Sequence, residues 1–281
     1  MSVLPETEPL SIPQIVAAKG REKIAMLTAY DASSAALLDE AGIDILLVGD
    51  SVEMTVYGQP STLTATMDTM IRHTRAVSRA VRRAVVVGDM PFLSYQAEPA
   101  RAVENAGRFL AEGGAAAVKV EGGRRILPAV EAILAADIPV MGHVGLTPQS
   151  FRKLGGFKVQ GREADSAREI VEDAQALASA GCFAIVLECV PETLAAEITE
   201  KIPVPTLGIG AGLHCDGQVL VFHDVVGLTR DLRPKFVRRY ADLSTVIGDA
   251  ARAFAKDVKS GDFPSREESF TGAKPTLRRV H

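Results

Sequence analysis

Short runs of aliphatic residues alternate along the chain with longer stretches in which apolar residues recur every three or four positions. A continuous apolar run of four to eight residues is typical of a strand buried on both faces, and the longer period is typical of an amphipathic helix. The pattern predicts eight strands, at residues 24–29, 45–48, 84–88, 117–120, 139–144, 184–187, 205–209 and 218–222. Strands that alternate with helices in this number predict an α/β protein with a single closed (β/α)8 TIM barrel.

The stretches between the strands carry helix and loop signals. Residues 12–20 are expected to form a short helix, and Asp31 is expected to cap a longer helix after the first strand. The connections at 52–64 and 145–162 are predicted to be loops, which at such a length are commonly functional. Residues 235–258 are expected to be mostly helical.

No linker or low-complexity segment divides the 281 residues. We therefore predict one barrel domain with a short N-terminal extension (1–22) and a C-terminal helical and polar tail (about 235–281). A composition of 47% hydrophobic and 23% charged residues is typical of a soluble globular protein. The net charge of -4 gives no electrostatic reason to expect binding to nucleic acid or to an anionic membrane.

Cysteine usage and the N-terminus bear on the compartment. Cys182, Cys189 and Cys215 form no C-x-x-C pair, so we expect neither a disulfide framework nor a zinc site. No apolar stretch approaches the roughly 20 residues that span a bilayer. The acidic N-terminus lacks the basic and apolar pattern of a signal peptide, and the cytoplasm is the expected location.

Polar and ionisable residues stand at the ends of five of the predicted strands. They are Asp50 and Ser51, Asp89, Lys119 and Glu121, His143, and Glu188. Because all strands of a parallel barrel point the same way, their C-terminal ends share one mouth, and these side chains are expected to converge there. Carboxylates beside a hydroxyl suit a hard divalent cation, Mg²⁺ first, that could hold two substrate oxygens and polarise a carbonyl.

Structural roles are the alternative for most of these residues. Asp50 and Asp89 could cap helices, although neither is followed at once by a helical pattern. Lys119 could form a solvated ion pair with Glu121 at the rim. His143 could be a hydrogen-bonded structural histidine rather than a base.

Glu188 ends a strongly apolar run, and desolvation there suits a carboxylate to act as a general base. Its structural alternative is to cap the helix that begins near Pro191. The glycine-rich run at 208–212 could cradle a phosphate, but no lysine or arginine accompanies it, and room for a flat ligand explains it equally well.

A series of segments, in order along residues 24–240, resembles the ketopantoate hydroxymethyltransferase family. The matching segments are 26–31, 48–51, 89–92, 118–123, 142–150, 155–162, 187–191, 208–212 and 216–218. The resemblance implies a (β/α)8 barrel that assembles into a homo-oligomer, typically a decamer. It also implies transfer of a hydroxymethyl group from 5,10-methylenetetrahydrofolate to 3-methyl-2-oxobutanoate, which gives 2-dehydropantoate and tetrahydrofolate in pantothenate biosynthesis.

The resemblance also implies roles for residues. It implies Mg²⁺ held by Asp50 and Asp89, which thereby also bind substrate, with Glu121 in or next to the metal shell. The oxo acid would chelate the metal, and Ser51 and Lys119 would contact its carboxylate.

Two further roles follow from the same resemblance. Glu188 matches the proton acceptor that acts at C3 of the oxo acid, which gives a metal-stabilised enolate. His143 is implied to touch substrate or product.

The chain departs from the family pattern in the connection after the second strand. Glu53 stands where the family usually has glycine, and residues 59–62 read Gln-Pro-Ser-Thr where the family often has His-Asp-Ser-Thr. We expect these departures to change the geometry of the loop rather than the type of reaction.

Two other functions compete with this interpretation. A metal-dependent enzyme of the phosphoenolpyruvate mutase and isocitrate lyase type would also form an oxo-acid enolate, and a folate requirement would discriminate the two. A non-catalytic binding barrel would bind an oxo acid without turnover. Glu53 favours that second alternative, whereas the gathered ionisable residues oppose it.

Overall fold

Eight parallel strands pair in chain order and close into a barrel, because the last strand also pairs with the first. The computed structural model describes residues 8–156, 158–230, 234–270 and 272. The strands are β1 (Ile24–Thr28), β2 (Ile45–Val48), β3 (Val85–Asp89), β4 (Ala117–Glu121), β5 (Val140–Gly145), β6 (Ala184–Glu188), β7 (Thr206–Ile209) and β8 (Gly217–Leu220). The predicted TIM barrel is confirmed, and each strand boundary lies within two residues of the sequence prediction.

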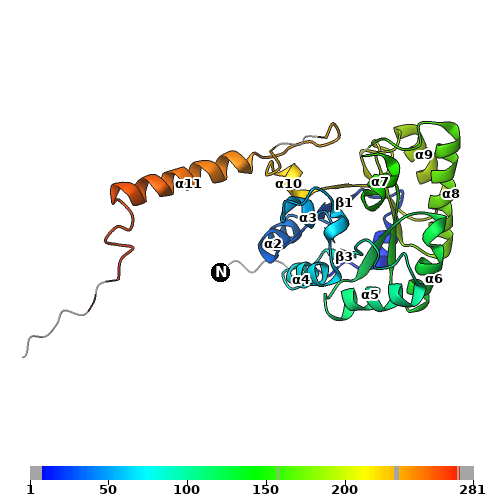
Figure 1. Ribbon diagram of the computed structural model, residues 1–281, viewed down its shortest axis with the longest axis horizontal. Helices are drawn as coiled ribbons and strands as arrows, with labels where there is room; N and C mark the ends of the chain where they lie inside the picture. The colour runs from blue at the N-terminus through cyan, green and yellow to red at the C-terminus, as the bar shows by residue number, and fades with distance from the viewer. Residues whose placement is uncertain (1–7, 157, 231–233, 271, 273–281) are drawn as a thin grey trace, which may run out of the picture.

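Helices surround most of the barrel (Figure 1). The long ones around it are α2 (Ala32–Glu40), α4 (Met67–Ser78), α5 (Pro99–Ala111), α6 (Leu127–Ala135), α8 (Ala164–Ala180) and α9 (Glu192–Lys201). The connection between β7 and β8, all of it described, contains no helix, and β8 leads only into the short α10 (Phe222–Val225). The outer faces of β8 and β1 therefore lack the helix that the strict alternation predicted.

Several short elements correct the sequence predictions. The predicted loop at 52–64 contains α3 (Val52–Thr55) and a 3-10 turn, η1 (Thr62–Thr64). The predicted loop at 145–162 likewise contains η3 (Pro148–Ser150) and α7 (Phe151–Leu154), and η2 (Arg124–Ile126) precedes α6. Helices of one turn carry no apolar period, so the sequence pattern could not reveal them.

The N-terminal part of the chain mostly follows its predictions. The short α1 (Ile12–Ala17) ends earlier than predicted, and Ile15 packs with Ile24 in the cluster that fills the barrel. Asp31 caps α2 as predicted, since its Oδ1 accepts a hydrogen bond from Ser34 N at 2.9 Å. The segment before the first strand thus contributes a buried residue, Ile15, to the core inside the barrel.

Two apolar clusters form the core. One fills the barrel and includes alternate residues of the strands, such as Met26, Val87 and Val186. The other lies between the strands and the surrounding helices and includes Leu46 and Phe109. Because side chains alternate along a strand, this division tells which residues point inward.

The C-terminal part was predicted to be helical from residue 235, but the helix there, α11, runs only from Leu243 to Ser260. It extends away from the barrel (Figure 1), and none of its residues is buried. Among the described residues no helix is long and apolar enough to cross a membrane.

Candidate active site

The inward positions of four neighbouring strands end in ionisable residues. Val85 and Val87 point into the barrel, so Asp89 continues the same face of β3, and the same alternation applies to β4, β5 and β6. The register pairs Asp89 with Lys119 and Glu121 with His143. Parallel pairing thus brings together at one mouth residues that lie far apart in sequence.

Three carboxylates lie at the centre of this mouth. One oxygen each of Asp50, Asp89 and Glu121 lies within 4.8 Å of the others, and the residues are 3%, 2% and 2% exposed. Burial, together with the charges of Asp89 and Glu121, raises the pKa of Asp50 well above its usual range. Burial also raises the pKa of Asp89, although the neighbouring ammonium of Lys119 opposes it.

Lys119 is the single ammonium in contact with this cluster among the described residues. Its Nζ donates to both carboxylate oxygens of Asp89, at 2.7 and 2.8 Å, and to Glu121 Oε1 at 3.3 Å. Burial lowers the pKa of Lys119, but the adjacent carboxylates outweigh this effect and the pKa is raised. Because its side chain is only 5% exposed, the alternative of a solvated ion pair at the rim is wrong.

His143 lies between two acids. Its Nδ1 is 3.4 Å from Glu121 Oε1, and its Nε2 is 3.2 Å from Glu188 Oε2. Burial and Lys119 lower the pKa of His143, but the two glutamates outweigh them and raise it to about 9. Neither nitrogen makes a hydrogen bond of good geometry within the described chain, so a satisfied structural histidine is not what we observe.

Glu188 stands at the outer edge of the cluster, where its side chain is 15% exposed. The strand next to it is shaped by Gly145, whose φ is +92° and where a Cβ would lie 2.4 Å from the Glu188 carbonyl oxygen. Glycine therefore allows the close approach in which Leu146 N donates to that carbonyl at 2.8 Å. Glu188 does not cap α9, because the helix begins after Pro191 without a side-chain cap.

Asp50 and Ser51 follow β2 directly. The sequence prediction that no helix follows at once is wrong here, because α3 begins at Val52, yet no side chain caps that helix. Asp50 N donates to Asp89 Oδ2 at 3.3 Å, and the Ser51 hydroxyl lies 2.8 Å from the hydroxyl of Tyr30. Ser51 is thus oriented by a tyrosine whose role the sequence analysis did not anticipate.

The departure at Glu53 lies in the second strand's connection and outside the carboxylate cluster. Glu53 is 6% exposed, and its Oε2 accepts a hydrogen bond from Thr64 Oγ1 at 2.8 Å. Its carbonyl oxygen accepts from Gln59 N at 2.8 Å. Glu53 therefore ties the two ends of this loop together, which agrees with an effect on loop geometry.

Gln149 is a second residue without an assigned role that reaches the cluster. It lies in η3, is 6% exposed, and donates from Nε2 to Asp50 Oδ2 at 3.0 Å. Its backbone N donates to Glu121 Oε2 at 3.0 Å. Gln149 lies in the segment 142–150, one of those that match the family, but its uncharged side chain gave no indication of a role in the cluster.

The donor set fits a hard divalent cation. The cluster supplies carboxylate oxygens only, which are the ligands that Mg²⁺ and Ca²⁺ prefer. No donor among the described residues reaches Asp50 Oδ1, and burial together with repulsion from Asp89 and Glu121 raises the pKa of Asp50. A cation between these oxygens would remove that repulsion.

Comparisons of the sequence with known proteins point to one family. The sequence profile of a family described as ketopantoate hydroxymethyltransferase matches residues 9–266. A 3-methyl-2-oxobutanoate hydroxymethyltransferase of Carboxydothermus hydrogenoformans is 56% identical over 260 residues, which cover 92% of this chain and 94% of the relative. One from Syntrophobacter fumaroxidans is 54% identical over 271 residues and 96% of each chain.

Solved structures share the fold. Phosphonopyruvate hydrolase superposes with a TM-score of 0.61 at 16% identity, over 94% of this chain and 92% of that chain. Phosphoenolpyruvate phosphomutase of Streptomyces platensis gives 0.60 at 16% identity over the same shares. At this identity the likeness concerns the barrel alone.

Proposed function

The chain belongs to the ketopantoate hydroxymethyltransferase family and is a one-carbon transferase, and we propose the following reaction for it. It transfers a hydroxymethyl group from 5,10-methylenetetrahydrofolate to 3-methyl-2-oxobutanoate and gives 2-dehydropantoate and tetrahydrofolate. The observation that carries the proposal is the buried group of three carboxylates beside one lysine, with a more exposed glutamate at its edge. This arrangement suits enolate chemistry on a 2-oxo acid.

We propose Mg²⁺ as the cofactor, held by Asp50 and Asp89, with Glu121 beside it. Glu121 belongs to the same group of carboxylates, and its oxygens face Lys119 Nζ and the backbone N of Gln149, which hold it in place beside the two aspartates. When bound, Mg²⁺ would supply polarisation of the keto carbonyl and stabilisation of negative charge on the enolate oxygen.

Lys119 and Ser51 are proposed to bind the carboxylate of the oxo acid. Lys119 is fixed in a single position by Asp89, and an ammonium with three donors can share them between that aspartate and a substrate carboxylate. The Ser51 hydroxyl is held by Tyr30, which leaves it pre-oriented.

Glu188 is proposed to remove the proton at C3, and His143 is proposed to touch the substrate or product. A C–H bond beside a ketone is weakly acidic, so a positioned base typically contributes about 10²–10⁴-fold to the rate. The 3.2 Å contact with His143, whose pKa is raised to about 9, supports a Glu188 carboxylate held in place beside the imidazole.

Exchange of the C3 proton of 3-methyl-2-oxobutanoate for deuterium, followed by NMR, tests this assignment. We expect exchange by the wild type that depends on Mg²⁺, loss of exchange in Glu188→Gln, and normal exchange in Glu197→Gln, an exposed control. Exchange that survives in Glu188→Gln would contradict the assignment of the base. Absence of exchange in the wild type, with Mg²⁺ and tetrahydrofolate present, would contradict the proposed reaction.

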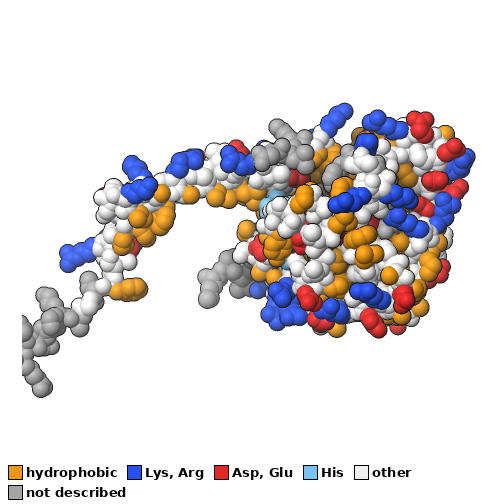
Figure 2. Space-filling model, viewed as in Figure 1, with side chains coloured by type: hydrophobic (Ala, Val, Ile, Leu, Met, Phe, Trp, Pro, Cys, Tyr) orange, Lys and Arg blue, Asp and Glu red, His pale blue; other side chains and the backbone are white. Residues whose placement is uncertain are grey.

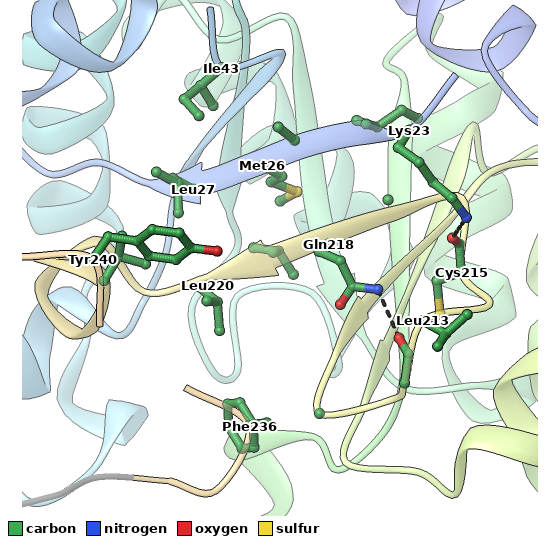
Figure 3. Close-up of a pocket in the computed structure, with 17 residues that line it drawn as sticks. Lys23, Met26, Leu27, Ile43, Leu213, Cys215, Gln218, Leu220, Phe236 and Tyr240 are labelled. Carbon is green, nitrogen blue, oxygen red and sulfur yellow. Dashed lines mark hydrogen bonds between the residues drawn. The ribbon is translucent and has the colours of Figure 1, made fainter. Parts of the chain in front are cut away.

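We further propose that the protein acts in the cytoplasm as a homo-oligomer, typically of ten copies, in which α11 of one copy docks on the barrel of another. The bare outer faces of β1 and β8 support this arrangement. Ala25 and Gln218 are exposed there, in contrast to the fully buried β2, β3 and β4. They line a groove of about 810 Å³ (Figure 3), where a barrel would ordinarily hold its eighth helix.

The helix α11 offers a matching surface. Ile247, Phe254 and Val258, spaced along one side of the helix, are 54%, 58% and 47% exposed. Figure 2 shows hydrophobic side chains along one edge of α11 and basic side chains along the other. An unburied apolar stripe of this kind commonly marks a protein interface.

Sedimentation analysis of two aspartate substitutions tests the assembly. Phe254→Asp on α11 and Leu213→Asp in the groove are each expected to lower the mass of the assembly. Lys256→Asp lies about 200° around the helix from Phe254 and should leave the mass unchanged. If α11 instead folded back on its own barrel, Phe254→Asp would lower the melting temperature at unchanged mass, which would contradict the proposal.

A further inference from the structure

The side-chain amide of Gln149 spans the barrel mouth from the segment after β5 to those after β2 and β3. Its Nε2 donates to Asp50 Oδ2 at 3.0 Å and to the carbonyl oxygen of Met90 at 2.9 Å. Its Oε1 accepts from the Tyr95 hydroxyl at 2.9 Å and from Gln96 Nε2 at 3.0 Å. Both donors and both acceptor positions of the amide are therefore in use.

This network fixes the amide in one orientation. The carbonyl of Met90 can only accept, so the amino group of Gln149 must face it and Asp50. On the other side, the Tyr95 hydroxyl accepts from Glu121 N at 2.9 Å and has two acceptors in reach, Gln149 Oε1 at 2.9 Å and the carbonyl oxygen of Glu121 at 3.1 Å, of which Gln149 Oε1 is the nearer. A flip of the amide would oppose oxygen to oxygen at Met90 and at Asp50.

Gln149 also acts on a second carboxylate through its backbone. The same residue donates from its backbone N to Glu121 Oε2 at 3.0 Å, while its side chain occupies Asp50 Oδ2. Asp50 Oδ1 is left without a donor among the described residues. One buried neutral residue thus determines which oxygens of two acids remain available.

We propose that Gln149 is a positioning residue that holds the Asp50 carboxylate with Oδ1 presented to the divalent cation, and that Tyr95 holds Gln149 in the orientation this requires. The inference rests on the Mg²⁺ of the proposed function and deepens it. An amide suits the task because it orients a carboxylate without neutralising it, whereas a lysine there would compete with the cation. Partners that orient a ligand in this way typically account for 10–100-fold in metal affinity.

Calorimetric titration of the full-length protein with Mg²⁺ tests the proposal. Gln149→Met keeps the length of the side chain and the backbone donor to Glu121 but removes the amide, and we expect the dissociation constant to rise about 10–100-fold. Tyr95→Phe should raise it less, and Gln96→Met, the matched control, should change it less than twofold because it leaves both donors of Gln149 in place. The spectrum of bound Mn²⁺ should change in Gln149→Met and not in the control.

Activity adds a readout that misfolding would not reproduce. At saturating Mg²⁺, the turnover of Gln149→Met should recover most of the wild-type value, because the lost contact acts through the cation. A folded Gln149→Met that binds Mg²⁺ within twofold of the wild type would overturn the proposal. If that variant does not fold, an unchanged dissociation constant in Tyr95→Phe would overturn it alone. A wild type that binds no Mg²⁺ would overturn the cofactor of the proposed function as well.

Discussion

Two aspartates are buried at opposite ends of the barrel, and their surroundings differ in kind. Asp216 lies at the N-terminal end of β8 and is 6% exposed. It accepts hydrogen bonds from Lys19 Nζ at 2.9 Å, from Gly20 N at 3.1 Å and from Thr206 N at 2.9 Å. This carboxylate joins the segment after α1 to the starts of β7 and β8.

Asp50 lies beyond the C-terminal end of β2 and is 3% exposed. It accepts one hydrogen bond, from Gln149 Nε2, and shares its cavity with Asp89 and Glu121. At this end three carboxylates surround one ammonium, that of Lys119.

The pKa directions reflect this contrast. Burial alone would raise the pKa of Asp216, but the Thr206 amide and the Lys19 ammonium outweigh it, and the pKa is lowered. For Asp50, burial and two like charges act together, and the pKa is raised well above its usual range. Similar burial of one residue type therefore stabilises the fold at one end and stores electrostatic repulsion at the other, where a cation would relieve it.

The largest effect is expected from Asp50→Asn. If the carboxylate cluster holds the cation, this variant should lose about a thousandfold in C3 exchange, equivalent to roughly 4 kcal/mol. Without metal, its free energy of unfolding should rise by about 1 kcal/mol, since repulsion is relieved. Chemical denaturation and the exchange assay measure both, and a variant that is less stable without metal would contradict the contrast.

A smaller effect is expected from Asp216→Asn, which should lower stability and leave activity unchanged. Loss of the charge that Lys19 and Thr206 surround should lower the free energy of unfolding by about 2–3 kcal/mol, because the partly buried ammonium of Lys19 keeps its bond to the Thr199 carbonyl oxygen but loses its counter-charge. The folded variant should keep its turnover number. Denaturation at one fixed protein concentration measures the change, and a loss under about 0.5 kcal/mol would show that this end contributes little.

The smallest effect concerns pH. Because the folded-state pKa of Asp216 is lowered, its stabilisation is fully present above the unfolded value of about 3.9 and is lost as pH falls through the folded value. The difference in stability between wild type and Asp216→Asn should be constant from about pH 8 to 5 and shrink below about pH 4. A difference in stability that grows as the pH falls would contradict a lowered pKa of Asp216 in the folded state.

Much of the fold and the composition of the cluster could be predicted from the sequence. Buried strands can be recognised in the sequence as apolar runs. Because a parallel barrel brings the C-terminal ends of its strands to one mouth, the topology alone predicted that Asp89 and Glu188 lie at the same end of the barrel. The family assignment came from matched segments. The catalytic and binding roles of the cluster residues stay predictions until the exchange assay is made.

Other features could not be predicted, for physical reasons. Gln149 and Tyr95 are neutral, and their importance lies in contacts across the mouth that no local pattern encodes. The bare face over β1 and β8 was missed because α11 is amphipathic, as helices that pack on a barrel are, and sequence periodicity does not show whether a helix packs on its own barrel.

Thermal unfolding with and without Mg²⁺ tests the central contrast most directly. A cation that binds only the folded state adds about 2.7 kcal/mol at one hundred times its dissociation constant. We predict that Mg²⁺ raises the melting temperature of wild type and Asp216→Asn by the same amount and leaves Asp50→Asn almost unchanged. An equal rise in Asp50→Asn would contradict the account, because the cation would then bind elsewhere than at the carboxylates of the barrel mouth.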